Sequence, residues 1–433
     1  MLVTHSATLA ANERIQARMR AGVDVLHLAF GEAGLPVHPE LADVLARSAH
    51  RTGYPPVIGD EHARAAVAGY FARRGVQAEK DQVVLAPGSK ALLLALLYAL
   101  PGDVVLPQPS WVSYAAQAAL LGRRTLPVPI PEHTGGVPDP QLLATTLDDA
   151  KRAGRHPGVL LVTRPDNPTG AVAPDADLKA VCDVAAEHDL TVISDEIYGD
   201  LAYGLEAEAY PTSPATLIPE RTIVTTGLSK RLALGGWRIG AALVPPGEPG
   251  TSLVANLTAV GSEIWSSMAA PMQDVTAYAF DEPPEMQRYI AQARHLHGAV
   301  ATAMWRTWVE AGANCREPQG GFYCYPDLTA HAGRVAAAGA TTSAELSELL
   351  LARYNVGVLP GTAFGDAPDR LAMRVATSLL YGRTVDERQA ALDSEHPADL
   401  PWIKHSMDRM RDALDDLLGP RPVAHDHKRT SAT

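Results

Sequence analysis

From about residue 60 to about residue 285, the chain alternates short apolar runs rich in β-branched residues with longer stretches of helical periodicity. The short runs include 83–87, 103–109, 158–165, 190–196 and 221–227, and helical stretches such as 90–100, 113–122 and 177–189 lie between them. Strands that alternate with helices predict a mostly parallel sheet with helices on both faces. We therefore expect an α/β fold of three layers.

The flanking pattern predicts a second, smaller α+β domain. Residues 7–20 and 286–313 have helical periodicity, and residues 25–36 have an extended pattern. Further helices are expected near 343–354 and 400–418. We expect an N-terminal arm with part of the small domain at 1–50, a large domain at 51–285, the small domain at 286–419 and a disordered tail at 420–433. The charged segment 381–401 is interpreted as a partly helical surface elaboration.

Composition narrows the choice of partners and compartment. The 433 residues carry 37 basic and 49 acidic side chains, a formal net charge of −12, which disfavours nucleic acid as a partner. The longest apolar run, 91–100, is about half the length of a membrane span, so we expect a buried helix there and no membrane contact. Three cysteines without a CxxC pair favour free thiols, no metal site and a cytoplasmic protein.

Unusual polar residues follow several of the predicted strands. They are Gly88, Ser89 and Lys90 in APGSK, Asn167 in RPDNPTG, Asp195 and Tyr198 in SDEIYGD, and Lys230 and Arg238 in SKRLALGGWRIG. Ligands of such sheets bind at the carboxyl ends of the strands, so we expect these side chains to lie close together. Taken singly, each has an ordinary explanation: a solvated loop, a turn, a helix cap or a surface charge.

Together and in this order, the four motifs resemble the class I/II aminotransferases, which are pyridoxal-phosphate enzymes of fold type I. The resemblance extends from about residue 25 to 418. It implies that Lys230 bonds the cofactor and moves a proton, and that Asp195 faces the ring nitrogen. It further implies the roles of the remaining residues, with Asn167 and Tyr198 on the phenolic oxygen, Trp111 stacked on the ring, and Arg238, Gly88, Ser89 and Lys90 on the phosphate.

The same resemblance implies a substrate side and a partner subunit. Arg374, in MRVATS, matches the arginine that binds the substrate carboxylate. Phe30 and Gly31 of the FGEAG segment and Asn167 are also expected on the substrate side. Tyr54, in GYPPVIG, matches a tyrosine that reaches the phosphate of the neighbouring subunit, so we expect a homodimer with shared sites. Either Ser266 or Ser267 is a further candidate for this crossing contact.

Two departures from the family pattern affect the expected specificity. Gly227 stands where many members carry a phosphate-binding serine, and Lys90 is expected to replace that contact. No arginine lies between Arg238 and Arg288, which disfavours a dicarboxylate substrate. We expect Trp265 and Phe30 to form an apolar or aromatic wall for the substrate side chain, with packing at the dimer interface as the alternative for Trp265.

The expected activity is therefore the transfer of an amino group between an α-amino acid, with an apolar or aromatic side chain, and a 2-oxo acid. The alternative is β- or γ-elimination, replacement or carbon–carbon bond formation, because the same residues serve those outcomes equally. A dinucleotide enzyme is disfavoured, since GGWRIG is not GxGxxG and its glycines follow a lysine instead of a first strand.

Overall fold

The structure is a computed structural model of the chain, and it describes residues 5–131, 135–203 and 210–419. The expected disordered tail at 420–433 lies outside these residues. A seven-stranded sheet has the strand order β2-β8-β7-β6-β5-β3-β4, and β8 is antiparallel to both of its neighbours. Its strands are β2 (Val83–Ala86), β3 (Asp103–Gln108), β4 (Thr125–Pro129), β5 (Pro157–Thr163), β6 (Thr191–Asp195), β7 (Thr222–Gly227) and β8 (Gly240–Leu243).

Helices cover both faces of this sheet, as the alternating pattern predicts. Along β5, Val159 and Leu161 pack in one core cluster, while Leu160 and Val162 pack in another on the opposite face. The first face is covered by α4 (Ser89–Ala99), α5 (Val112–Leu120) and α10 (Gly247–Ile264). The second face is covered by α3 (Glu61–Arg73), α6 (Pro140–Arg152), α7 (Asp175–Glu187) and α11 (Ala270–Asp281). The predicted three-layer α/β architecture is confirmed.

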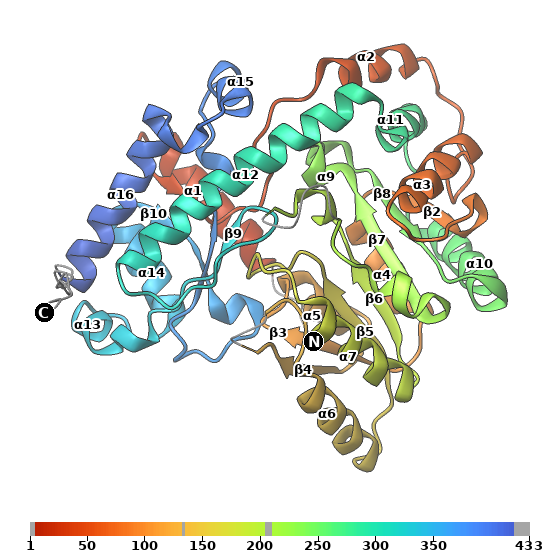
Figure 1. The fold of residues 1–433 in the computed structure, drawn as a ribbon, viewed down its shortest axis with the longest axis horizontal. Helices are drawn as coiled ribbons and strands as arrows, with labels where there is room; N and C mark the ends of the chain where they lie inside the picture. Colours follow the sequence, from red (N-terminus) through yellow and green to blue (C-terminus); the bar gives the residue numbers. More distant parts are fainter. Residues whose placement is uncertain (1–4, 132–134, 204–209, 420–433) are drawn as a thin grey trace, which may run out of the picture.

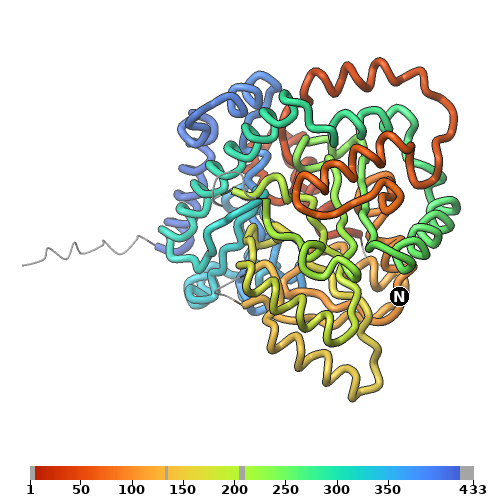
Figure 2. Tube along the Cα trace, turned by 45° about the vertical axis from the view of Figure 1, so that its right-hand side comes forward, coloured from red at the N-terminus to blue at the C-terminus, as the bar shows by residue number. Residues whose placement is uncertain are grey.

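A second group of strands brings the two ends of the chain together. β1 (Leu26–His27) pairs in parallel with β10 (Val356–Gly357), and an antiparallel sheet has the order β11-β12-β9. The last three strands are β9 (Tyr323–Cys324), β11 (Leu359–Pro360) and β12 (Met373–Ala376). In Figures 1 and 2, the blue C-terminal helices lie on one side of the molecule and the seven-stranded sheet on the other. The pairing of β1 with β10 explains why an N-terminal strand belongs with C-terminal ones.

The helices outside the large sheet follow the predicted apolar periodicity closely. The helix expected at 286–313 is α12 (Pro284–Glu310), which runs from beside α11 towards the C-terminal helices (Figure 1). The helix expected near 343–354 is α14 (Ser343–Tyr354), and the structure shows that a capping box of Thr342 and Glu345 starts it. The remaining helices are α1 (Ala7–Arg20), α2 (Pro39–Ser48), α8 (Pro214–Leu217), α9 (Leu228–Arg231), α13 (Ala332–Ala337), α15 (Val385–Asp393) and α16 (Pro401–Leu418).

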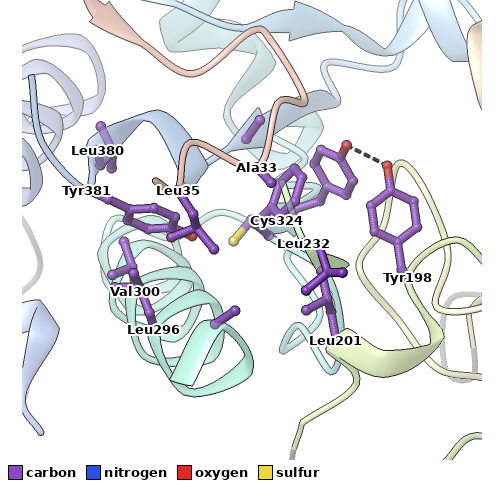
Figure 3. Close-up of a cluster of buried hydrophobic side chains, with 14 of the residues drawn as sticks. Ala33, Leu35, Tyr198, Leu201, Leu232, Leu296, Val300, Cys324, Leu380 and Tyr381 are labelled. Atoms are coloured by element: carbon purple, nitrogen blue, oxygen red, sulfur yellow. Dashed lines mark hydrogen bonds between the residues drawn. The ribbon is translucent and has the colours of Figure 1, made fainter. Parts of the chain in front are cut away.

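The segment 381–401 is helical in part, as expected, but it does not lie wholly on the surface. Tyr381 is fully buried, and its hydroxyl contacts His297 Nδ1 of α12 at 2.5 Å. Figure 3 shows Tyr381 in the same buried cluster as Leu35, Leu296 and Val300. The expectation of a surface elaboration is therefore wrong for this end of the segment, because its aromatic residue completes the core around α12.

Candidate active site

A cavity of about 420 Å³ lies at the carboxyl ends of the strands of the large sheet. The chain segments that follow β2, β3, β5, β6 and β7 all contribute to its wall, together with residues from β9 and β12 of the smaller group. Most of the expected site residues line it: Phe30, Gly31, Ser89, Lys90, Trp111, Asn167, Asp195, Tyr198, Lys230, Arg238 and Arg374. The structure thus brings together residues that are far apart in the sequence.

Lys230 is held on a short turn between β7 and the loop that leads into β8. Gly227 caps α9, and the Lys230 Nζ donates a hydrogen bond to the carbonyl of Gly31. Burial, followed by the positive charge of Arg374, lowers the pKa of Lys230 to about 8. An amine with this pKa is neutral in an appreciable fraction of molecules near neutral pH, as a nucleophilic lysine requires.

Asp195 ends β6 and is almost completely buried, with 3% of its surface exposed. Its carboxylate accepts hydrogen bonds from the Tyr114 hydroxyl at 2.9 Å and the Thr225 hydroxyl at 3.1 Å. Burial raises the pKa of Asp195 to about 6, although these hydrogen bonds oppose the shift. The sequence analysis missed Tyr114 and Thr225, and only the pairing of β6 with β7 places Thr225 opposite Asp195.

Asn167 and Tyr198 form a hydrogen-bonded group with a third residue that the sequence analysis missed. Asn167 Nδ2 donates to the Tyr198 hydroxyl at 3.3 Å, and this hydroxyl lies 2.8 Å from that of Tyr323. Figure 3 shows Tyr198 beside a buried cluster, with its hydrogen bond drawn as a dashed line. A Cβ on Gly31 would lie 2.2 Å from the Tyr323 hydroxyl, so glycine is required where this segment passes Tyr323.

The part of the cavity wall formed by Ser89, Lys90 and Arg238 is basic. Gly88 precedes the first residue of α4, where backbone N–H groups are free to bind an anion. A Cβ on Gly88 would lie 2.2 Å from Arg238 Nη2, so the glycine leaves room for the guanidinium. Lys90 Nζ lies 5.1 Å from the Trp111 ring, and burial together with the charge of Arg238 lowers the pKa of Lys90. This part of the wall therefore suits a phosphate group.

Arg374, on β12, closes the cavity from the side of the smaller sheet. It is 1% exposed, and it donates to Asn167 Oδ1 at 3.2 Å and to the carbonyl of Ala29 at 2.9 Å. Its Nε is buried and has no hydrogen-bond partner among the described residues. A buried guanidinium that keeps a free donor at the wall of a cavity suits a carboxylate ligand.

The residues expected to contact a partner subunit lie elsewhere. Tyr54 is 91% exposed, and Trp265 follows α10 and packs against Gly261. Neither residue, nor Ser266 or Ser267, lines the cavity in the described part of this single chain. Their crossing contacts stay predictions, as does the wall formed by Trp265.

Gly227 has a local reason to be a glycine. A Cβ at this position would lie 2.6 Å from the carbonyl oxygen of Ile239, on the adjacent strand connection. A serine therefore has no room here unless the backbone moves. The contact that the family resemblance assigns to a serine at this position would have to come from another group, such as Lys90, which also lines the cavity.

These residues fit pyridoxal phosphate. The cavity combines an amine of lowered pKa, a buried carboxylate with a raised pKa, an aromatic ring and a basic pocket at a helix N-terminus. The fold and this combination define a pyridoxal-phosphate enzyme of fold type I. Among the described residues, no helix is long and apolar enough to cross a membrane, and no group of three His, Cys, Asp or Glu side chains is placed to hold a metal.

Comparison with known proteins defines the family. The model of class I and II aminotransferases matches residues 23–378. An aspartate aminotransferase of Geobacillus stearothermophilus is 32% identical over 396 residues, which are 89% of this chain and 95% of the relative. A probable aspartate/prephenate aminotransferase of Thermus aquaticus is 32% identical over 365 residues, 83% of this chain and 89% of the relative.

Solved structures agree with the sequence relatives. The aspartate aminotransferase from Thermus thermophilus with maleate has a TM-score of 0.79 and 26% identity, covering 95% of this chain and 97% of its own. The aromatic aminotransferase from Pyrococcus horikoshii has a TM-score of 0.73 and 26% identity, covering 93% and 99%. The chain belongs to the class I and II aminotransferase family. It is a transferase that depends on pyridoxal phosphate.

Proposed function

We propose that this enzyme moves an amino group between an α-amino acid and a 2-oxo acid, with Lys230 as the catalytic base and Arg374 as the carboxylate-binding residue. The observation that carries the proposal is that both side chains line one cavity. Arg374 is buried and Lys230 is partly buried, and neither has an ion-pair partner among the described residues. When bound, pyridoxal phosphate supplies the electron sink that makes the Cα proton of an amino acid labile.

The remaining residues hold and orient the reactants. With pyridoxal phosphate bound, Asp195 would keep a proton on the ring nitrogen, and Asn167 and Tyr198 would donate hydrogen bonds to the phenolic oxygen. Arg374 binds the α-carboxylate of the substrate, which presents the Cα proton to the Lys230 amine. Arg238, Lys90 and the N-terminus of α4 bind the phosphate.

For the substrate side chain, we propose an apolar or aromatic group. Leu9, Phe30 and Trp111 line the cavity, and Lys90 is the cavity cation that remains once Lys230, Arg238 and Arg374 have their roles. If Lys90 binds the phosphate in place of a serine at 227, no lysine or arginine of the cavity wall is left for a second carboxylate. The likeness to an aromatic aminotransferase supports this proposal.

A dicarboxylate is the second candidate, and Lys90 is again the observation that favours it. If the phosphate is held by Arg238 and the N-terminus of α4 alone, the Lys90 ammonium is available to a side-chain carboxylate. The names of the aspartate aminotransferase relatives support this reading. The role of Lys90 therefore decides between the two substrate classes.

Single-turnover reaction with a panel of amino acids, without any 2-oxo acid, tests these proposals. We expect stoichiometric conversion of the bound cofactor to its amine form, with one 2-oxo acid released and identified by mass spectrometry. A faster single-turnover reaction with phenylalanine or leucine than with aspartate supports an apolar or aromatic substrate, and the reverse order supports a dicarboxylate. Repeated turnover of one substrate without amine-form cofactor would instead indicate elimination or replacement chemistry.

Two further properties belong to the proposal. We propose a cytoplasmic homodimer in which Tyr54 reaches the phosphate of the partner subunit, supported by its exposure of 91%. We also propose the domain boundaries near residues 50, 285 and 419. Sedimentation of the purified protein, and of a Tyr54→Phe variant in parallel with cofactor titration, separates assembly from the phosphate contact.

A further inference from the structure

Four charged side chains form a closed ring of ion pairs next to the active-site segments. Arg74 contacts Asp200 and Glu282, both at 2.5 Å, and Arg231 contacts the same two carboxylates at 2.9 and 3.0 Å. The side chains of Arg231, Asp200, Glu282 and Arg74 are 1%, 3%, 7% and 14% exposed. We call this set the buried ion-pair ring. Its two positive and two negative charges balance.

The ring joins segments that carry the chemistry of the cavity. Arg231 is the residue after Lys230, on the same short helix α9. Asp200 follows Tyr198 by two residues, in the 3-10 turn Gly199–Leu201. Because both residues are so close in sequence to the cavity residues, a displacement of either ring member is passed directly to Lys230 or to Tyr198.

The other half of the ring attaches these segments to the surrounding helices. Arg74 follows the end of α3, and Glu282 lies between α11 and α12. Glu282 has a left-handed backbone with φ of 54°, which is uncommon for a residue other than glycine. Its contacts with Arg73, Arg74 and Arg231 hold this conformation at the start of the long helix α12.

Aromatic rings and backbone groups limit the movement of both arginines. The Tyr70 ring lies 3.6 Å from the Arg74 guanidinium and 4.6 Å from that of Arg231, and its hydroxyl donates to Asp200 at 3.0 Å. Arg231 also lies 4.6 Å from the Phe280 ring and donates to the carbonyl of Ala279 at 2.8 Å. The guanidinium of Arg231 therefore has a fixed orientation, which alkyl packing alone does not impose.

We propose that the buried ion-pair ring is a positioning device that fixes Lys230 relative to Tyr198, with Arg231 and Asp200 as positioning residues. This inference rests on the proposed function, since it concerns the placement of the catalytic base. Neither residue lines the cavity, so each acts through its neighbour in the chain. When one charge is removed, the remaining partners are left unbalanced in a dry site, and the segments must shift to restore pairing or admit water.

The test uses Asp200→Asn, which keeps the shape of the side chain, and Arg231→Met, which keeps an unbranched apolar stem; each removes one charge. The matched control is Arg155→Met. Arg155 pairs with Asp103 at 2.9 Å, and the two side chains are 22% and 16% exposed. This pair lies at the amino ends of β3 and β5, whereas the cavity lies at their carboxyl ends. We expect kcat of the ring variants to fall roughly 10- to 100-fold, since a small misplacement of a catalytic group has this effect. KM should stay within about twofold, as Arg374 is untouched.

Two measurements distinguish positioning from general destabilisation. The first is the pH at which the visible absorbance of the bound cofactor changes, which reports on its bond to Lys230. The second is the rate at which the cofactor-free protein captures pyridoxal phosphate, which does not depend on turnover. Both should change in the ring variants and stay at wild-type values in Arg155→Met, even where the melting temperatures of all three fall. Arg231→Lys should restore part of kcat.

The proposal would be overturned if folded Arg231→Met and Asp200→Asn kept the wild-type kcat, the wild-type pH of the absorbance change and the wild-type rate of cofactor capture. If a single variant does not fold, the double variant Arg231→Met/Asp200→Asn leaves Arg74 paired with Glu282 and no charge of the ring unbalanced. A double variant with wild-type kcat and capture rate overturns the proposal, and one in which both are lowered supports it. If the wild type converts no amino acid, the proposed function fails, while the capture rate still tests the ring.

Discussion

Lys230 of the cavity and Arg231 of the buried ion-pair ring are neighbours in the chain, but the two sets of charges to which they belong behave in opposite ways. In the buried ion-pair ring, Asp200 pairs with Arg74 and Arg231, and Glu282 pairs with the same two arginines and also with Arg73 outside the ring. The two arginines hold the pKa of Asp200 below its usual range despite burial. In the cavity, burial moves the pKa of Asp195 up to about 6 and that of Lys230 down to about 8. Among the ion pairs of the described residues, none includes Asp195, Lys230 or Arg374.

The difference shows that the charges that hold segments of the fold in place are distinct from the charges that line the cavity. Where the chain supplies every counter-charge, the charges are stable as ions and hold segments in place. Where it supplies only neutral hydrogen-bond partners, the charged form is disfavoured until a ligand of opposite charge arrives. In the proposed function, the missing partners would be a protonated ring nitrogen for Asp195 and a substrate carboxylate for Arg374.

The largest expected effect comes from removing the cavity amine. Lys230→Ala should lower kcat by about 10⁴-fold or more, because it removes the proposed base for the Cα proton. The folded protein should still bind pyridoxal phosphate without a covalent bond. The free energy of unfolding of the cofactor-free form should not decrease, since the variant removes a buried amine without an acidic partner. Retained multiple turnover would contradict the assignment of Lys230.

Removing a ring charge should have the opposite signature. Glu282→Gln should lower the free energy of unfolding by about 3–5 kcal/mol, because it leaves two buried arginines with one carboxylate. Denaturant titration measures this change. The control is Glu348→Gln, whose pair with Arg14 is more than half exposed and should contribute about 0–1 kcal/mol. Equal losses in the two variants would show that the ring gives no special stability.

A third change tests the cavity carboxylate. Asp195→Asn should lower kcat by about 10²–10³-fold, because the charge on the ring nitrogen loses its partner. Stability of the cofactor-free protein should be unchanged or higher, in contrast to Glu282→Gln. A near-native rate would mean that another group, such as the Tyr114 hydroxyl, is sufficient at the ring nitrogen.

A pH profile of the cofactor-free protein gives a smaller effect. Capture of pyridoxal phosphate should increase as pH rises through about 8, because only the neutral Lys230 amine reacts. The pKa of Lys230 in the folded protein is below its value of about 10.4 in the unfolded chain. Burial of the charged amine therefore lowers the free energy of unfolding by its full amount below pH 8, and this loss disappears as the pH rises from 8 towards 10.4. Arg374→Leu should move the midpoint upwards, whereas Arg155→Met should leave it in place.

The smallest expected effect concerns Trp265. Trp265→Ala should change the ranking of amino donors in the single-turnover panel by about tenfold or less, if the side chain reaches a substrate in the assembled enzyme. The same panel with wild type provides the reference. A loss of stability alone, with the ranking unchanged, would assign Trp265 to packing and remove it from the substrate side.

Much of the fold and the centre of the site could be predicted from the sequence. The strands at 83–87, 158–165 and 190–196 are apolar on both faces and separate well from the amphipathic helices. The polar residues that follow such strands must meet at one edge of the sheet, which is why Asn167, Asp195 and Lys230 were predicted together. Their roles were implied by the family resemblance, and the structure adds their burial and contacts.

The supporting residues could not be predicted in this way. Thr225 meets Asp195 through strand register, and Tyr323 meets Tyr198 across 125 positions of the chain. The buried ion-pair ring was even harder to predict, because arginine is usually a surface residue. The partners of Arg231 depend on how α3, α11 and the turn Gly199–Leu201 pack together. The sequence analysis named no strand at β8 (Gly240–Leu243), because glycine and alanine have little preference for a strand.

The bond between Arg374 and the carbonyl of Ala29 joins positions 345 residues apart. The proposed phosphate-binding residues Gly88 to Lys90 and Arg238 are synthesised more than a hundred residues before Arg374. Of the residues proposed to bind cofactor or substrate within one chain, Arg374 is therefore the last to be made, and the cavity is complete only when the C-terminal strands have joined the N-terminal segment.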